Sequence, residues 1–199
     1  MSTTQSPTVA APDTGTVTAW KLDPAHTVVE FSTKHMMLTT VKGRFADVRG
    51  TITADRRDPE RSSVEVEIAA ASIDTRADQR DQHLRSADFL DAAHHPAITF
   101  ESTRVKGAHA KAGDRFEVTG DLTIRGVTRQ ITLDCTFEGT NTDPWGNLKA
   151  GFTATSRIDR RDWGLTWNQA LETGGILVGN DVRISVEAQA VQEGSGTRP

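Results

Sequence analysis

The stretch RFEVTGDLTIRGVTRQITLDCTF, residues 115–137, decides the fold class of this chain. Its first half alternates apolar or small residues with polar ones, which is the period of two of a half-buried β-strand. The apolar face carries Phe116, Val118, Gly120, Leu122 and Ile124. A second such run follows Arg125-Gly126, with Val127, Ile131, Leu133, Cys135 and Phe137 on its apolar face. A dipeptide ending in glycine between two alternating runs predicts a tight antiparallel hairpin, because glycine tolerates the positive φ of such turns.

The same alternation extends over most of the chain. It recurs over residues 148–158 and 182–190, and shorter apolar runs lie at 29–31, 41–45, 64–68 and 98–100. Between the run 41–45 and the run 48–52 the apolar phase slips by one residue, which predicts a β-bulge. About eight strands joined mostly by short turns predict an all-β fold, either an antiparallel barrel or a sandwich.

Residues 74–96 depart from the strand pattern. They contain no run of β-branched residues, and the residues at helical spacing are Ala77, Arg80, Leu84 and Ala87. A short helical segment near residues 75–92 is therefore expected. Asp74 or Thr75 is its expected N-cap, and Pro96 is expected to end it.

Composition excludes several classes of protein. Of the 199 residues 36% are hydrophobic, and 23 Lys+Arg against 27 Asp+Glu give a net charge of −4. No basic stripe is present, so we expect no nucleic-acid partner. No apolar stretch reaches the roughly 18 residues of a transmembrane helix, so no transmembrane segment is expected. A single cysteine, Cys135, excludes an internal disulfide and any Cys-x-x-Cys motif.

One domain is expected between two tails. Residues 1–18 and 192–199 are rich in small and polar residues, so disordered tails are predicted on either side of a domain over residues 19–191. The first twenty residues show neither the basic start nor the apolar run of a signal peptide, and the expected location is the cytoplasm.

The polar residues form no recognisable catalytic or metal-binding pattern. None of the six histidines has the His-x-His or His-x3-His spacing of a zinc site, so no metal or other cofactor is expected. Acid–base catalysis would need to recruit Asp81 with His83, or Asp162 with Arg160, and no nucleophile elbow accompanies either pair. Cys135 lies mid-strand among apolar residues, which favours inert packing over a nucleophilic role.

Five blocks of the chain, in order, carry a resemblance to a known family. They are WKLDPAHT (20–27), RDQHLRSADF (80–89), GDLTIRGVT (120–128), DWG (162–164) and LVGNDVRI (177–184). On these blocks the domain resembles the YceI-like, polyisoprenoid-binding family over nearly its whole length. The sequence departs from the usual family pattern at His94-His95-Pro96, where an aromatic residue often precedes the proline, and at Trp163, where phenylalanine is usual.

The resemblance implies an extended, eight-stranded, lipocalin-like antiparallel β-barrel. It also implies an apolar tunnel that binds a polyisoprenoid or another long-chain lipid for storage, transport or sequestration, and a homodimer without known catalysis. The residues themselves allow two interiors. Small residues such as Gly43, Gly120 and Ala154 among large ones either leave a cavity or reflect tapered packing, and we favour the cavity.

Aromatic and flexible side chains are the expected contacts of an apolar ligand. They are Phe31, Phe45, Phe100 and Phe152 along the tunnel, Leu84, Phe89, Met36 and Met37 near an entrance, and Trp163 and Trp167 over a tunnel mouth. The alternative for the two tryptophans is that they seal the barrel end as core.

Arginines are the expected readers of a phosphate head-group, if the ligand has one. Arg160, or Arg76 with Arg80, would donate to the phosphate oxygens. The alternative, which we favour, is that these arginines form surface ion pairs with Asp78, Asp81 or Asp162.

Two other functions are kept open from the sequence. One is an enzyme acting on a lipid-like substrate inside the barrel, and the other is a ligand-free stress-response interaction module with a filled barrel. For the homodimer, an exposed apolar patch is expected from residues 74–96 and 160–175, with Leu84, Phe89, Leu90, Leu165, Trp167 and Leu171.

Overall fold

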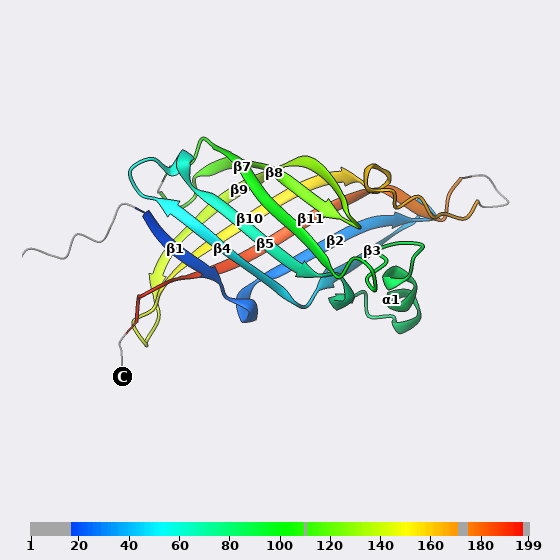
Figure 1. The fold of residues 1–199 in the computed structure, drawn as a ribbon, viewed down its shortest axis with the longest axis horizontal. Coiled ribbons are helices and arrows are strands. Elements are labelled where there is room, and N and C mark those ends of the chain that lie inside the picture. The colour runs from blue at the N-terminus through cyan, green and yellow to red at the C-terminus, as the bar shows by residue number, and fades with distance from the viewer. Residues whose placement is uncertain (1–16, 110, 171–174, 197–199) are drawn as a thin grey trace, which may run out of the picture.

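The computed structural model describes residues 17–109, 111–170 and 175–196, which form a long antiparallel β-barrel (Figure 1). Residues 1–16 and 197–199 of the predicted tails lie outside the described residues, and so does Leu171 of the expected dimer patch. No helix in the described part of the chain is long and apolar enough to cross a membrane.

Strands dominate the described chain. They are β1 (Val17–Leu22), β2 (Val28–His35), β3 (Thr39–Phe45), β4 (Val48–Asp55), β5 (Ser63–Ala69), β6 (Ile73–Asp74), β7 (Ala97–Lys106), β8 (Arg115–Ile124), β9 (Val127–Thr142), β10 (Leu148–Asp159) and β11 (Val178–Gln192). The helical elements are α1 (Asp78–Arg85) and four short 3₁₀ turns, η1 (Pro24–His26), η2 (Pro59–Arg61), η3 (Ala70–Ser72) and η4 (Arg160–Trp163).

Eight strands close the barrel. They pair in the order β1–β4–β5–β7–β8–β9–β10–β11, and β11 pairs back with β1 through Leu22 and Ala190. The long strand β11 also pairs with β2 over Glu187 to Val178, so β1 and β2 continue one another along the same side of the barrel. The predicted eight-stranded antiparallel barrel is confirmed, and the alternative of a sandwich is excluded.

The hairpin that opened the sequence argument is confirmed. Strands β8 and β9 pair from Ile124 and Val127 at the turn back to Arg115 and Thr136. Arg125 and Gly126 both have positive φ, 51° and 73°. Left-handed conformation at both central residues is the geometry of a two-residue turn whose twist matches that of the strands.

The predicted β-bulge at the phase slip is wrong. Ala46 and Asp47 separate two strands there, because β3 pairs with β2 and β4 pairs with β1. The Ala46 N–H donates to the Ser72 carbonyl, and the Asp47 carbonyl accepts from the Ala69 N–H. The slip in apolar phase therefore marks a change of partner strand and not an extra residue within one strand.

The helix is shorter than predicted and its expected cap is wrong. It begins at Asp78 after Ala77, which makes no side-chain capping bond. Asp74 instead accepts from the Arg76 N–H in a turn whose left-handed residue is Arg76, at φ 62°. Thr75 is likewise engaged elsewhere, since its hydroxyl donates to Asp81. Both candidate caps therefore stabilise the turn before the helix.

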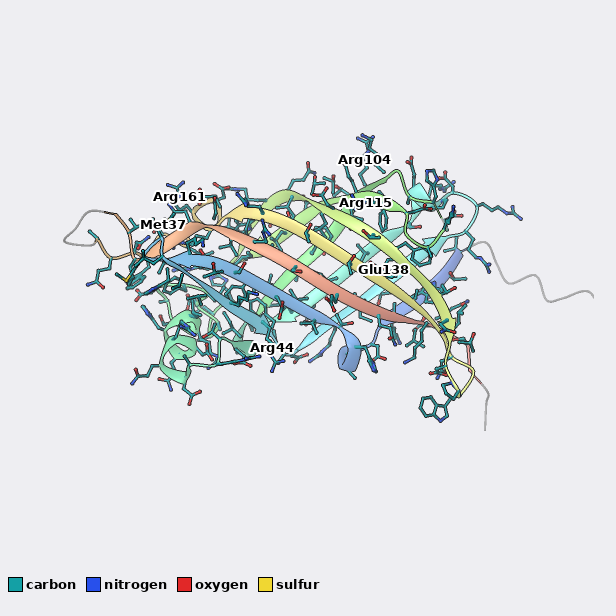
Figure 2. The ribbon with its side chains drawn as sticks, turned by 180° about the vertical axis from the view of Figure 1, so that it is seen from behind. Met37, Arg44, Arg104, Arg115, Glu138 and Arg161 are labelled. Carbon is teal, nitrogen blue, oxygen red and sulfur yellow. The ribbon has the colours of Figure 1, made fainter. Side chains whose placement is uncertain are left out.

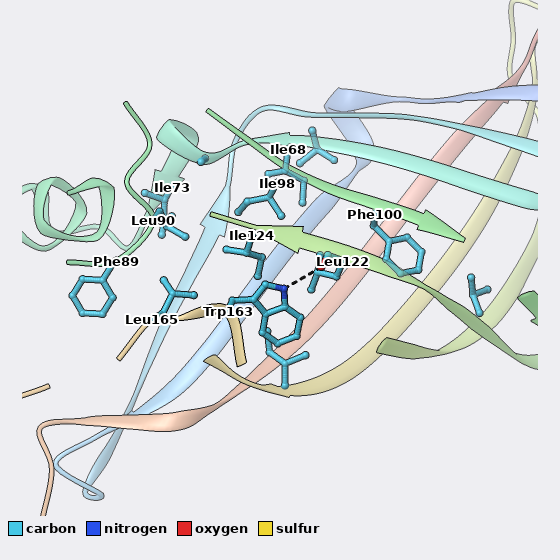
Figure 3. Packing of buried hydrophobic residues seen from close by; sticks show 14 of the residues in the cluster. Ile68, Ile73, Phe89, Leu90, Ile98, Phe100, Leu122, Ile124, Trp163 and Leu165 are labelled. Carbon is cyan, nitrogen blue, oxygen red and sulfur yellow. Dashed lines mark hydrogen bonds between the residues drawn. The ribbon is translucent and has the colours of Figure 1, made fainter. Parts of the chain in front are cut away.

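The two ends of the barrel differ in what covers them. One end, called the helix end, carries α1, the β8–β9 turn and η4, and the other, called the loop end, carries the β4–β5, β7–β8 and β9–β10 connections (Figure 1). Buried side chains gather at the helix end (Figure 3). Trp163 is 2% exposed there, and its indole N–H donates to the Leu122 carbonyl at 3.0 Å.

Candidate apolar binding cavity

The barrel encloses a cavity of about 580 Å³, within the usual size of small-molecule sites. Inward-facing side chains of the barrel form the wall of the cavity. The charged side chains of Arg104, Arg115 and Glu138 point outward (Figure 2). All seven phenylalanines of the chain line the cavity. They are Phe31, Phe45, Phe89, Phe100, Phe116, Phe137 and Phe152.

Seven of the eleven predicted contact residues line this cavity. They are Phe31, Phe45, Leu84, Phe89, Phe100, Phe152 and Arg160. Met36, Met37, Trp163 and Trp167 are not among the lining residues. The two methionines lie at the tip of the β2–β3 hairpin, where Met37 is 65% exposed (Figure 2).

The sequence prediction missed Phe116 and Phe137 as contacts, although both lie on the apolar faces of its two clearest strands. The same alternation that predicted those strands also predicts that both rings face inward. The aliphatic wall, with Leu133 and Ile184 among its members, was missed in the same way.

Two glycines make room for phenylalanine rings on the wall. A Cβ at Gly43 would lie closer than 3.0 Å to the Phe31 ring, and a Cβ at Gly120 would lie 2.5 Å from Phe100 Cζ. Each ring therefore lies directly over a glycine backbone. The space directly above these two glycines is filled by the rings. The cavity is the space that remains beside rings lying against the wall.

The cavity surroundings suppress thiol chemistry at Cys135. This residue is 7% exposed and lines the cavity. Burial raises the pKa of its thiol to about 12, so the nucleophilic thiolate is scarce at neutral pH. Its observed environment agrees with the inert packing role expected from the sequence.

An aromatic cluster of His83, Trp167 and the cavity-lining Phe89 packs at the helix end. The His83 ring meets Trp167 edge-on at 4.6 Å and Phe89 at 5.1 Å between ring centroids. His83 Nε2 lies 2.8 Å from an Asp88 carboxylate oxygen, which fixes the orientation of the imidazole. Trp167 thus packs against His83 of α1 at the helix end.

The residues expected to form an exposed dimer patch are covered within this chain. Phe89, Leu90 and Leu165 are each less than 10% exposed, and Leu84 and Trp167 are half-buried. The premise of an uncovered apolar surface is therefore wrong for the described residues of that patch, because α1 and the segment after η4 pack against each other and onto the barrel.

Arg160 is buried and forms no surface ion pair, and its donors are all used within the protein. It is 5% exposed, and its Nε–H donates to the Gly179 carbonyl at 3.0 Å. Its remaining N–H groups donate to four more oxygens, the carbonyls of Leu165, Trp167 and Val178 and the side chain of Asn180. The pKa of Arg160 is lowered by burial, in spite of the opposing effect of Asp159. Arg160 therefore holds the segment after η4 against β11.

The other predicted arginine pairings are also wrong. Arg80 donates to the Thr75 hydroxyl and carbonyl, both at 2.7 Å. The buried Asp81 accepts from the N–H and the hydroxyl of Thr75. An arginine and a carboxylate thus both bind Thr75, and together they tie α1 to β6. The expectation of a surface pair failed because backbone oxygens at the helix end require donors.

Neither pair proposed for acid–base catalysis forms. His83 contacts Asp88 and not Asp81, and Arg160 binds carbonyl groups and not Asp162. Within residues 17–109, 111–170 and 175–196, no three His, Cys, Asp or Glu side chains lie close enough together to hold a metal ion.

Polar residues gather around the cavity at the loop end. Those that line it there are Thr18, Asp55, Arg56, Ser62, Ser63, His109, Thr140 and Gln192. Arg56 and His109 are exposed, so the cavity reaches solvent at this end. The result is an apolar lumen with a polar rim at the loop end.

The sequence of this chain matches a known protein family and several of its members. The YceI-like domain matches residues 20–190. Protein YceI of Escherichia coli O6:H1 is 43% identical over 162 residues, which is 81% of this chain and 81% of that protein.

Two solved structures share the architecture. The Campylobacter jejuni YCEI protein is 30% identical with a TM-score of 0.66, and the match covers 79% of this chain and 88% of that one. A polyisoprenoid binding domain from Saccharophagus degradans is 14% identical with a TM-score of 0.63, covering 87% and 98%. The second match shows a shared fold.

Proposed function

The chain belongs to the YceI-like domain family, and from this premise we propose that it binds a long apolar chain, a polyisoprenoid or a related lipid, inside its barrel. The observation that carries the proposal is the placement of all seven phenylalanines around one cavity. Rings that only filled a core would leave no space of about 580 Å³ between them.

The energetics favour a chain over a compact ligand. Each buried CH₂ contributes about 0.8 kcal/mol, so a chain of about 20 carbons gains about 16 kcal/mol. Association costs about 4–15 kcal/mol, which leaves about 1–12 kcal/mol. Micromolar affinity corresponds to about 8 kcal/mol, so it is reached when the association cost is about 8 kcal/mol or less. The aromatic wall offers no fixed pattern of donors, which suits a ligand without polar groups along its length. The named binding activity of the Saccharophagus degradans domain supports an isoprenoid as the chain.

A titration with retinol tests the proposal, because retinol is a neutral isoprenoid alcohol whose fluorescence rises in apolar surroundings. We expect saturable binding to the purified protein and displacement by geranylgeraniol. Absence of binding, or binding that geranylgeraniol does not displace, would count against the proposal. Conversion of the bound alcohol to a new product would instead favour the enzyme alternative.

A pair of neighbouring substitutions locates the binding in the lumen. Ala154 lines the cavity, whereas Thr155, the next residue of β10, is exposed on the outer face. Ala154→Trp fills the lumen and is expected to abolish retinol uptake, and Thr155→Trp adds the same ring outside and is expected to leave uptake intact. Circular dichroism of both variants controls for loss of the fold.

The homodimer and the cytoplasmic location are further proposals, and each rests on the sequence expectations alone. Because the expected apolar patch is packed within the chain, a dimer requires another surface. Sedimentation of the purified protein at micromolar concentration tests it, and a single monomeric species would refute it.

A further inference from the structure

Three groups that can carry a positive charge line the cavity: Arg56, His109 and Arg160. Arg160 has every N–H committed to oxygens at the helix end. An arginine presents five N–H donors, and Arg160 has none left for a ligand. Among the three cationic side chains, only the other two therefore have donors for a negatively charged group inside the cavity.

Arg56 and His109 differ from Arg160 in having unused donors. Within the described residues neither side chain makes a hydrogen bond or an ion pair with the protein. Both are exposed to solvent at the loop end while they line the cavity. A guanidinium in this position can donate two parallel hydrogen bonds to an oxyanion.

The two loops that carry these residues are held together. Glu60, in the turn after Arg56, accepts a hydrogen bond from the Gly107 N–H at 2.7 Å, and Gly107 begins the connection that contains His109. The Asp55 N–H is bound by the Ser62 hydroxyl at 3.0 Å, which closes the loop around Arg56. The rim is therefore fixed at both of its cationic positions.

Two acidic side chains of these loops, Asp55 and Glu60, are already occupied by backbone N–H groups. Asp55 accepts from the N–H groups of Arg57 at 2.9 Å and Asp58 at 3.1 Å, and Glu60 is used by Gly107. These backbone donors lower the pKa of Asp55. Both carboxylates thus stabilise the loops, and neither pairs with Arg56 or His109.

We propose that the loop end is an oxyanion subsite in which Arg56 and His109 bind the phosphate-type head of an amphiphilic lipid. The apolar tail then runs inward past the phenylalanines toward the helix end. This proposal rests on the proposed function, since it concerns one end of the same ligand. It assigns the ligand a class, a long chain ending in an oxyanion, and a direction in the barrel.

The experiment compares geranylgeranyl phosphate with geranylgeraniol, each displacing retinol from the wild type and from Arg56→Gln/His109→Asn. We expect the wild type to bind the phosphate about tenfold more tightly than the alcohol, from one charge-assisted bidentate contact. The double variant is expected to lose that preference and keep its affinity for geranylgeraniol. Arg57→Gln is the matched control, because Arg57 is the neighbouring arginine and does not line the cavity.

Each other outcome overturns a defined part of the account. Equal wild-type affinities for the phosphate and the alcohol would overturn the oxyanion subsite and leave the apolar site standing. A phosphate preference that survives in the double variant, or that Arg57→Gln abolishes, would place the subsite elsewhere. Failure of both lipids to bind would refute the proposed function itself. Competition by inorganic phosphate against geranylgeranyl phosphate, without competition against geranylgeraniol, would identify the phosphate as the group that is bound.

Discussion

The two ends of this barrel use cationic side chains in opposite ways, buried and bonded to the protein at the helix end and exposed at the loop end. At the helix end, Arg160 is buried and donates to backbone carbonyls, and Trp163 is buried in the core. At the loop end, Arg56 and His109 are exposed and bind no other described residue. Carboxylates at the two ends also differ: Asp159 is bound by the Arg161 side chain, whereas Asp55 is bound by backbone N–H groups.

The difference teaches that an arginine lining an apolar cavity is not by itself evidence of an anion site. A buried arginine whose donors all meet carbonyls is a structural clamp, since each carbonyl would otherwise be buried without a partner. An arginine with unused donors at a polar rim is available to a ligand. The number of N–H donors already bound by the protein, and not the position along the cavity, distinguishes a structural arginine from one that is available to a ligand.

The largest expected effect concerns the reactivity of Cys135, which lines the cavity between the two ends. With a pKa of about 12, Cys135 should react with iodoacetamide at pH 8 about 1,000-fold more slowly in the native protein than after unfolding. Mass spectrometry of the labelled protein over time measures both rates. Comparable rates would mean that one end admits water freely to the middle of the wall.

Removal of the clamp should give the next largest effect. Arg160→Met leaves several buried carbonyls without donors, and we expect a loss of about 3–5 kcal/mol in the free energy of unfolding. Chemical denaturation of Arg160→Met beside Arg161→Met measures it. The neighbour is exposed and paired only with Asp159, so its replacement should change stability little. Equal losses in the two variants would remove the distinction between clamp and surface arginine.

A pair of glycine substitutions contrasts the tight wall near the helix end with the looser wall near the loop end. Gly43→Ala forces a Cβ into the Phe31 ring and should cost about 1–3 kcal/mol. Gly151→Ala brings the new Cβ to 3.2 Å from Glu138 Cβ, a milder contact, and should cost less than Gly43→Ala, about 1 kcal/mol or below. Denaturation midpoints test the order, and a reversed order would show that the Phe31 ring does not lie over Gly43.

The smallest expected effect is the acid dependence at Asp159. Hydrogen bonding from Arg161 lowers the pKa of this carboxyl to about 2, below its unfolded value. The charged form therefore stabilises the fold above about pH 4, and this contribution is lost as the pH falls toward 2. Asp159→Asn should be less stable than the wild type at pH 7 and equal to it near pH 2. A stability difference that is constant with pH would show that the Arg161 contact is unimportant.

Much of this architecture could be predicted from the sequence because strands leave a local signal. The alternation around Arg125-Gly126 predicted a hairpin, and similar runs predicted an all-β fold that was either a barrel or a sandwich. The resemblance to a known family decided for the closed barrel. The bulge between Phe45 and Val48 was predicted wrongly because a change of partner strand produces the same phase slip as an extra residue.

The site was predictable in its apolar part only. The alternation of apolar and polar residues along a strand predicts which phenylalanines face inward, as it does for Phe100 and Phe152. The role of Arg160 depends on carbonyls up to nineteen positions away, at Gly179, and no local pattern reports them. Arg56 and His109 line the same cavity because distant strands pair and because Glu60 accepts a hydrogen bond from the Gly107 N–H. The spacing of these residues in the sequence does not predict either contact.

The most direct test of the account is a crystal structure of the protein with a long-chain alkyl phosphate that carries bromine on its last carbon. The account predicts an anomalous bromine peak inside the lumen near Phe45 and Phe89, with the phosphate at the loop end beside Arg56. A bromine peak outside the barrel, with the lumen free of ligand density, would contradict the central claim that the phenylalanine-lined cavity holds an apolar chain.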